Sequence, residues 1–159
     1  MTKNILYIIL LAALITACEK DDICLSPTTP KLILRFYDSE NPSNFKNIEH
    51  LSVWAEGKDT ISTYMNITTD SIAIPLRTGA SQTIYNFKTS TTGNRADNRY
   101  NKLTINYTTE TIFVSRSCGL KAIFNSVTIA SDNEWFQSVS PTTLPTIDLE
   151  TSAHVKIYH

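Results

Sequence analysis

Short runs in which apolar and polar residues alternate recur along the chain, and they constrain its fold more than any other feature. The clearest run is Leu103-Thr104-Ile105-Asn106-Tyr107-Thr108, and Asn, Asp, Ser, Gly and Pro separate it from similar runs. A period of two places alternate side chains on one face of a strand. Such runs, repeated about every 8–12 residues, are typical of an antiparallel sandwich. We therefore expect an all-β, antiparallel β-sandwich, immunoglobulin-like in outline, with a small β-barrel as the alternative.

About nine short strands are expected from these runs. Pro75 lacks a backbone N–H, so its strand is expected to end there or to lie at a sheet edge. Glu110 and Thr111 are expected to form a turn, and the polar segment 89–98 a mobile loop. The expected strands are 31–37, 51–55, 60–64, 71–76, 83–88, 103–108, 112–115, 122–129 and 153–158.

Residues 1–17 have the three parts of a secretory signal peptide. Lys3 supplies the positive charge, residues 5–15 form an apolar run, and small residues follow. A transmembrane anchor is the alternative, but a bilayer span needs about 20 apolar residues. We expect residues 1–17 to be removed, residues 18–30 to form a short tether, and residues 31–159 to form one domain.

The end of this segment points to a lipid anchor. Leu14-Ile15-Thr16-Ala17-Cys18 resembles the bacterial lipobox. The resemblance implies that Cys18 becomes the first mature residue and carries acyl chains such as palmitate, and two or more chains give stable anchoring. Lys20, Asp21 and Asp22 resemble the short signal that directs lipoproteins of Bacteroidota to the cell surface; a solvated polar tether is the alternative. The expected location is the outer membrane, facing the cell surface or the periplasm.

Cys24 and Cys118 form an even pair once Cys18 is assigned to lipidation. Outside the reducing cytosol such a pair predicts a disulfide, with free thiols as the alternative. Two cysteines without a histidine cluster are too few ligands for a structural zinc. The disulfide would leave residues 19–23 as free tether, at most about 17 Å long, so the domain should sit close to its membrane.

Charge and motifs exclude several classes of function. Without residues 1–17 the chain has 13 basic and 15 acidic residues, so it lacks the basic excess of nucleic-acid-binding proteins. Phosphate loops, nucleophile elbows and metal-binding helices are not found in the sequence. We expect no enzyme activity, no cofactor and no metal. A hydrolase would need His50 or His154 beside a serine or carboxylate in a cleft.

Two kinds of surface site remain as hypotheses. Trp135 and Phe136 follow a polar segment and could project from a loop to bind a ligand, although such aromatics more often cover a core. Trp54 lies in the middle of a predicted strand and is expected in the core. Thr60 and Ser71 follow aspartates, as in the O-glycosylation acceptors of Bacteroidota; ordinary turn chemistry is the alternative.

Several motifs together resemble a family of Bacteroidota lipoproteins of unknown function. They are the lipobox, Cys24 and the segments TPKLILRFY (29–37), IPL (74–76), INY (105–107) and FVSRSCG (113–119). The resemblance implies a compartment and a fold class but no activity. We expect a membrane-anchored, non-enzymatic accessory protein that binds an envelope protein partner. A surface protein that binds a glycan or another ligand is the alternative.

Overall fold

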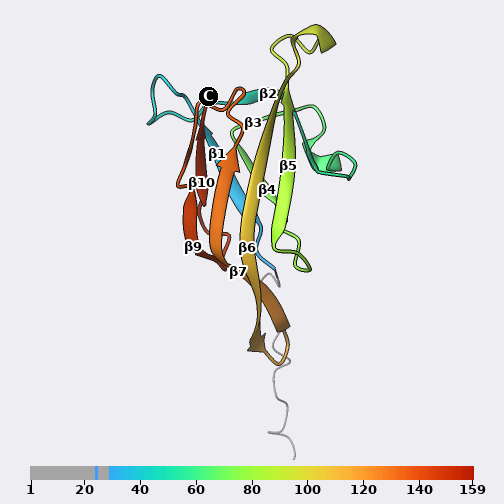
Figure 1. Cartoon of the computed structure of the whole chain (residues 1–159), viewed down its shortest axis with the longest axis vertical. Coiled ribbons are helices and arrows are strands. Elements are labelled where there is room, and N and C mark those ends of the chain that lie inside the picture. The colour runs from blue at the N-terminus through green and yellow to red at the C-terminus, as the bar shows by residue number, and fades with distance from the viewer. Residues whose placement is uncertain (1–23, 25–28) are drawn as a thin grey trace, which may run out of the picture.

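Two β-sheets packed face to face form the protein in the computed structural model, which describes residue 24 and residues 29–159 (Figure 1). One sheet has four strands in the order β4-β1-β10-β8, and the other has six in the order β3-β2-β5-β6-β7-β9. The expected all-β sandwich is confirmed, and the strands do not close into a barrel. The strands are β1 (Leu32–Tyr37), β2 (Ile48–Ala55), β3 (Ile67–Thr69), β4 (Ser71–Ile74), β5 (Gln82–Thr89), β6 (Arg99–Ser115), β7 (Gly119–Ser131), β8 (Ser138–Ser140), β9 (Thr143–Ile147) and β10 (Val155–Tyr158).

The pairing is antiparallel except between the first and the last strand. β1 and β10 run parallel, with Leu34 opposite Val155 and Phe36 opposite Ile157. Alternation places all four of these side chains in the core, where each is fully buried. Every other pair of neighbouring strands in the two sheets is antiparallel.

Pro75 follows the last residue of β4, which also lies at the edge of its sheet, so both expectations for this proline are met.

The prediction of a strand at 60–64 is wrong. This segment holds a single bridge at Thr60 and the short 3₁₀ helix η1 (Ser62–Tyr64). The hydroxyl of Tyr64 donates to the carbonyl of Ala73 and accepts from its N–H, at 3.0 and 2.9 Å. A side chain thus satisfies backbone groups of β4 that face no neighbouring strand.

The turn expected at Glu110 and Thr111 is also wrong. β6 runs without a break from Arg99 to Ser115, and Glu110 and Thr111 pair with residues of β7. Threonine favours strands, and residues 99–115 contain no glycine or proline to end one. The last part of β6 and the first part of β7 extend as a two-stranded ribbon beyond the rest of the sandwich (Figure 1).

Tyrosine hydroxyls fix the chain after β4 against the core. Tyr85 donates to the carbonyl of Pro75 at 2.5 Å, and burial raises the pKa of Tyr85 to about 12. The hydroxyl of Tyr107 donates to the carbonyl of Arg77 at 2.8 Å and accepts from its N–H at 3.0 Å.

The core between the sheets is aromatic and aliphatic. Its largest fully buried side chains include Phe36, Phe87, Phe124 and Phe136.

The predicted disulfide between Cys24 and Cys118 is confirmed, with the two Cα atoms 4.9 Å apart. Cys118 lies in the turn at the tip of the ribbon, and Gly119 follows it with φ of 68°, which glycine adopts without steric cost. The disulfide therefore joins the start of the described chain to the ribbon tip. No helix in the described part of the chain is long and apolar enough to cross a membrane.

Candidate binding surface

The expected core position of Trp54 is wrong, because its side chain lies on the outer face of the six-stranded sheet. Leu51 and Val53 of β2 are fully buried, whereas the Trp54 side chain is half-buried. The alternation of β2 therefore turns the indole outward. The ring of Tyr100, from β6, stands edge-on to it, with 6.5 Å between the ring centroids.

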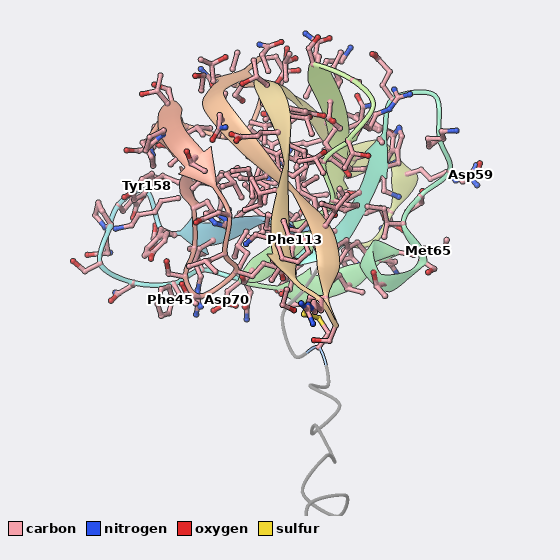
Figure 2. All side chains as sticks on the ribbon, turned by 90° about the horizontal axis from the view of Figure 1, so that it is seen from below. Phe45, Asp59, Met65, Asp70, Phe113 and Tyr158 are labelled. Carbon is pink, nitrogen blue, oxygen red and sulfur yellow. A yellow bond between two sulfur atoms is a disulfide. The ribbon has the colours of Figure 1, made fainter. Side chains whose placement is uncertain are left out.

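The two rings and Met65 border an open depression of about 550 Å³. Tyr100 is 53% exposed and Met65 is 58% exposed, so both present apolar surface to solvent. Polar side chains border the same depression, among them Lys58, Asp59, Asn66 and Lys88. We call this site the Trp54–Tyr100 depression. Figure 2 shows Met65 and Asp59, which both border the depression, on outer loops at one side of the sandwich.

Strand register brings the floor of the depression together. Ser52 of β2 lies opposite Lys88 of β5, and Lys88 lies opposite Tyr100 of β6. These three residues therefore form one row across the sheet, and Trp54 lies two positions along β2 from the row.

Hydrogen bonds of the two adjacent residues, Tyr64 and Asn66, hold Met65 at the border of the Trp54–Tyr100 depression. Tyr64 is bonded to β4, as described above, and the N–H of Asn66 donates to the Ser52 hydroxyl at 3.1 Å. The side-chain oxygen of Asn66 lies 3.0 Å from Nδ1 of His50. Asn66 has φ of 57°, a left-handed conformation that asparagine tolerates better than most residues. The exposed methionine therefore stands on a loop that is hydrogen-bonded on both sides.

Trp135 and Phe136 do not project from a loop, contrary to the geometry expected for ligand contacts. Trp135 is 8% exposed and Phe136 is fully buried. The side-chain oxygen of Asn101, itself buried, accepts hydrogen bonds from the N–H groups of both residues at 3.2 Å. The Phe136 ring packs 5.3 Å from that of Phe87. Phe136 is a core residue.

Trp135 also lines a cleft of about 420 Å³ at the end of the sandwich where β5 ends and β6 begins. His159 and Arg99 line the same cleft, and the His159 ring stands edge-on to the indole at 5.8 Å. Burial lowers the pKa of His159, and the positive charges of Lys46 and Arg99 lower it further. A ligand-binding role remains a prediction for Trp135 alone.

The loop expected to be mobile, 89–98, contains a compact hydrogen-bond cluster around Asp97. Its carboxylate accepts from the hydroxyls of Ser90, Thr91 and Thr92 at 2.8, 2.7 and 2.9 Å, and from the Thr92 N–H at 2.9 Å. The bonds from Thr91 and Ser90 hold the pKa of Asp97 well below its usual range. These hydrogen bonds join the two ends of the loop, next to the cleft that Trp135 lines.

Each histidine bonds to an amide or carbonyl group. His50 bonds to Asn66, and Nε2 of His159 lies 3.3 Å from the Lys46 carbonyl. His154 accepts from the Ile33 N–H at Nδ1 and donates to the Leu149 carbonyl through Nε2, at 2.9 and 2.8 Å. These bonds assign His154 the tautomer with its proton on Nε2.

The predicted modification sites differ in accessibility. Ser71 lies within β4, and its hydroxyl donates to the Leu34 carbonyl at 3.2 Å. Thr60 is half-buried at the border of the Trp54–Tyr100 depression. O-glycosylation of both remains a prediction. The predicted lipidation site Cys18 and the export signal Lys20, Asp21 and Asp22 lie outside the described residues.

Comparison with known proteins gives one match. No curated protein and no solved structure matches the chain. The sequence profile of a family of unknown function, DUF6452, matches residues 50–159. This stretch is more than half of the chain, and it contains Cys118, the ribbon and both rings of the Trp54–Tyr100 depression. The protein therefore belongs to DUF6452, a family of unknown function.

Proposed function

We propose that the mature protein is a non-enzymatic lipoprotein of the bacterial outer membrane, anchored through Cys18, which binds a partner protein at the Trp54–Tyr100 depression. Lys20, Asp21 and Asp22 are the proposed signal for the outer face of that membrane. The lipobox-like segment 14–18 supports the anchor. The Cys24–Cys118 disulfide supports the compartment, because disulfides persist outside the reducing cytosol.

One observation carries the binding proposal: Trp54, Tyr100 and Met65 expose apolar surface at a single depression bordered by polar side chains. Tryptophan, tyrosine and methionine are enriched in protein interfaces, and tryptophan and tyrosine are frequent hot spots there. A polar rim around an apolar centre is also the usual anatomy of an interface.

The position of the depression suits a partner away from the anchor. Tyr100 lies near the start of β6, and Ser115 ends that strand at the ribbon tip, beside the disulfide. Fifteen residue steps of strand separate them, about 50 Å at about 3.3 Å per residue. The depression therefore lies near the opposite end of the molecule from the point where the tether joins it (Figure 1).

A photocrosslinking amino acid, benzoylphenylalanine, placed at Met65 in intact cells should give a discrete product larger than the protein alone. The same amino acid at Phe45 is the matched control, since Phe45 is 56% exposed and does not border the depression. Adding Tyr100→Ala should remove the product, because truncation takes away an exposed ring from the site. Equal products from positions 65 and 45, or none from 65, would contradict the proposal.

Glycan binding is the second candidate. It is favoured by the proximity of the Trp54 and Tyr100 rings to the polar side chains of Asp59, Asn66 and Lys88. Aromatic faces beside hydrogen-bonding groups can contact the apolar and polar parts of a sugar together. Binding of purified envelope polysaccharide that is lost in Trp54→Ala, without any protein crosslink from position 65, would favour this candidate.

A further inference from the structure

The ribbon formed by the end of β6 and the start of β7 stands outside the sandwich. The pairing of β5 with β6 ends at Asn106, and the pairing of β7 with β9 ends at Phe124. Within the described chain, residues 110–115 and 119–123 therefore pair only with each other. An isolated two-stranded hairpin is marginally stable in water.

Apolar side chains lie on both faces of the ribbon tip, and Lys121 lies opposite Ile112 on one of them. Phe113 and Leu120 lie directly opposite each other and are 66% and 61% exposed, the two most exposed large apolar side chains described. Ile112 and Val114 alternate with Phe113 and so point to the other face, where both are half-buried. Adjoining exposed apolar side chains such as Phe113 and Leu120 often mark a site of contact with a membrane or another protein, so this tip is suited to an apolar environment.

The charges near the tip are positive. From Thr111 to its partner Ala122 the ribbon contains Arg116 and Lys121 but no aspartate or glutamate. Glu110, at the base of the ribbon, accepts a hydrogen bond from the side-chain amide of Asn125 at 2.7 Å. Arg116 lies in the exposed turn, and Lys121 donates to the Asp148 carbonyl at 2.9 Å. Cations beside an apolar tip match the arrangement of lipid phosphates above acyl chains.

The disulfide places the tip close to the proposed anchor. Cys118 lies in the turn between Phe113 and Leu120, and it is bonded to Cys24. Figure 2 shows the disulfide, drawn in yellow, at the end of the ribbon that carries Phe113. Six residue steps join Cys24 to Cys18, and they span at most about 21 Å. If Cys18 carries acyl chains, the ribbon tip is therefore held next to the bilayer.

We propose that the ribbon tip, through Phe113 and Leu120, inserts into the boundary between headgroups and acyl chains of the membrane that holds the anchor. The inference rests on the proposed lipid anchor. The ribbon acts as a second, non-covalent contact with the bilayer. With the tether it fixes the orientation of the domain, so that the Trp54–Tyr100 depression faces away from the membrane.

The test uses the lipidated protein, purified in detergent and reconstituted into phosphatidylethanolamine–phosphatidylglycerol vesicles. Phe113→Trp is compared with Phe45→Trp, an equally conservative change at an exposed phenylalanine whose loop lies at the other end of the sandwich (Figure 1). Phosphatidylcholine brominated in its acyl chains is included as the quencher. The Phe113→Trp variant should lose a larger fraction of its fluorescence than wild type, whereas Phe45→Trp should not. An intact Cys24–Cys118 disulfide on non-reducing gels and an unchanged near-ultraviolet spectrum show that both variants are folded.

The outcomes separate the two proposals. If the wild-type protein does not float with the vesicles, the lipid anchor fails, and with it the basis of the inference. If the protein floats but the Phe113→Trp variant is quenched no more than the Phe45→Trp variant, the insertion of the tip is overturned while the anchor stands. If the fluorescence of the Phe113→Trp variant instead shifts to the blue as protein density rises, without bromine quenching, the tip binds a second copy of the chain, which also overturns the proposal.

Discussion

Replacement of both Cys24 and Cys118 by serine should lower the free energy of unfolding by about 4 kcal/mol. The disulfide joins residues 94 positions apart, and a crosslink across a loop of this size removes much of the conformational entropy of the unfolded chain. Urea denaturation of the double variant and the wild type, under the same conditions, measures the difference. The double variant is used because a single one would leave a reactive thiol.

Reduction of the wild-type protein provides the control for this prediction. Reduced wild type and the double variant should unfold at the same urea concentration, since both lack the same crosslink. A loss below about 1 kcal/mol would contradict the prediction, because it would mean that the crosslink restricts the unfolded chain very little. Amides of residues 110–115 should show the largest gain in hydrogen exchange, since no strand outside the ribbon pairs with them or with their partners.

Truncation of Phe136 to alanine should cost about 3–5 kcal/mol of stability. The side chain is fully buried, and its ring packs 5.3 Å from Phe87 and 6.4 Å from Phe36, between the two sheets. Removing it leaves a cavity that these rigid neighbours cannot fill. Thermal or urea denaturation of Phe136→Ala measures the loss.

Phe136→Leu is the matched control for this variant. It keeps most of the apolar volume and should cost less than about 1.5 kcal/mol. If Phe136 were instead a ligand contact on an exposed loop, the alanine variant would unfold at the same denaturant concentration as wild type. That result would contradict the placement of this side chain in the core.

The alternating pattern predicted much of the fold because alternation follows directly from strand geometry. The buried positions of β1 and β10 are those at which the apolar residues recur, and Pro75 ends β4 as its missing N–H requires. The disulfide followed from counting cysteines. In contrast, the sequence of β6 contains no signal for where its partners end, so its continuation into the ribbon depended on pairing with β7.

The two tryptophans were misjudged or left open for different reasons. The alternation of β2 indicates the outward position of Trp54, since Leu51 and Val53 supply the buried side chains of this strand. The expectation of a core position followed the general preference of tryptophan and not this alternation. For Trp135 the sequence left both outcomes open, with cover of the core as the more frequent one. The polar residues before it suggest a loop. Its backbone N–H donates to the side chain of Asn101, which lies 34 residues earlier in the chain. Only the folded sheet brings these two segments together.

Mass spectrometry of the mature N-terminal peptide, from protein purified out of the membrane fraction, tests the central claim most directly. The account predicts a tryptic peptide that begins at Cys18 and carries the mass of acyl chains. It also predicts that Cys18→Ala abolishes this modification and leaves the protein outside the membrane fraction. A mature N-terminus at any other residue, or an unmodified Cys18 on a protein that remains bound to the membrane, would contradict the account.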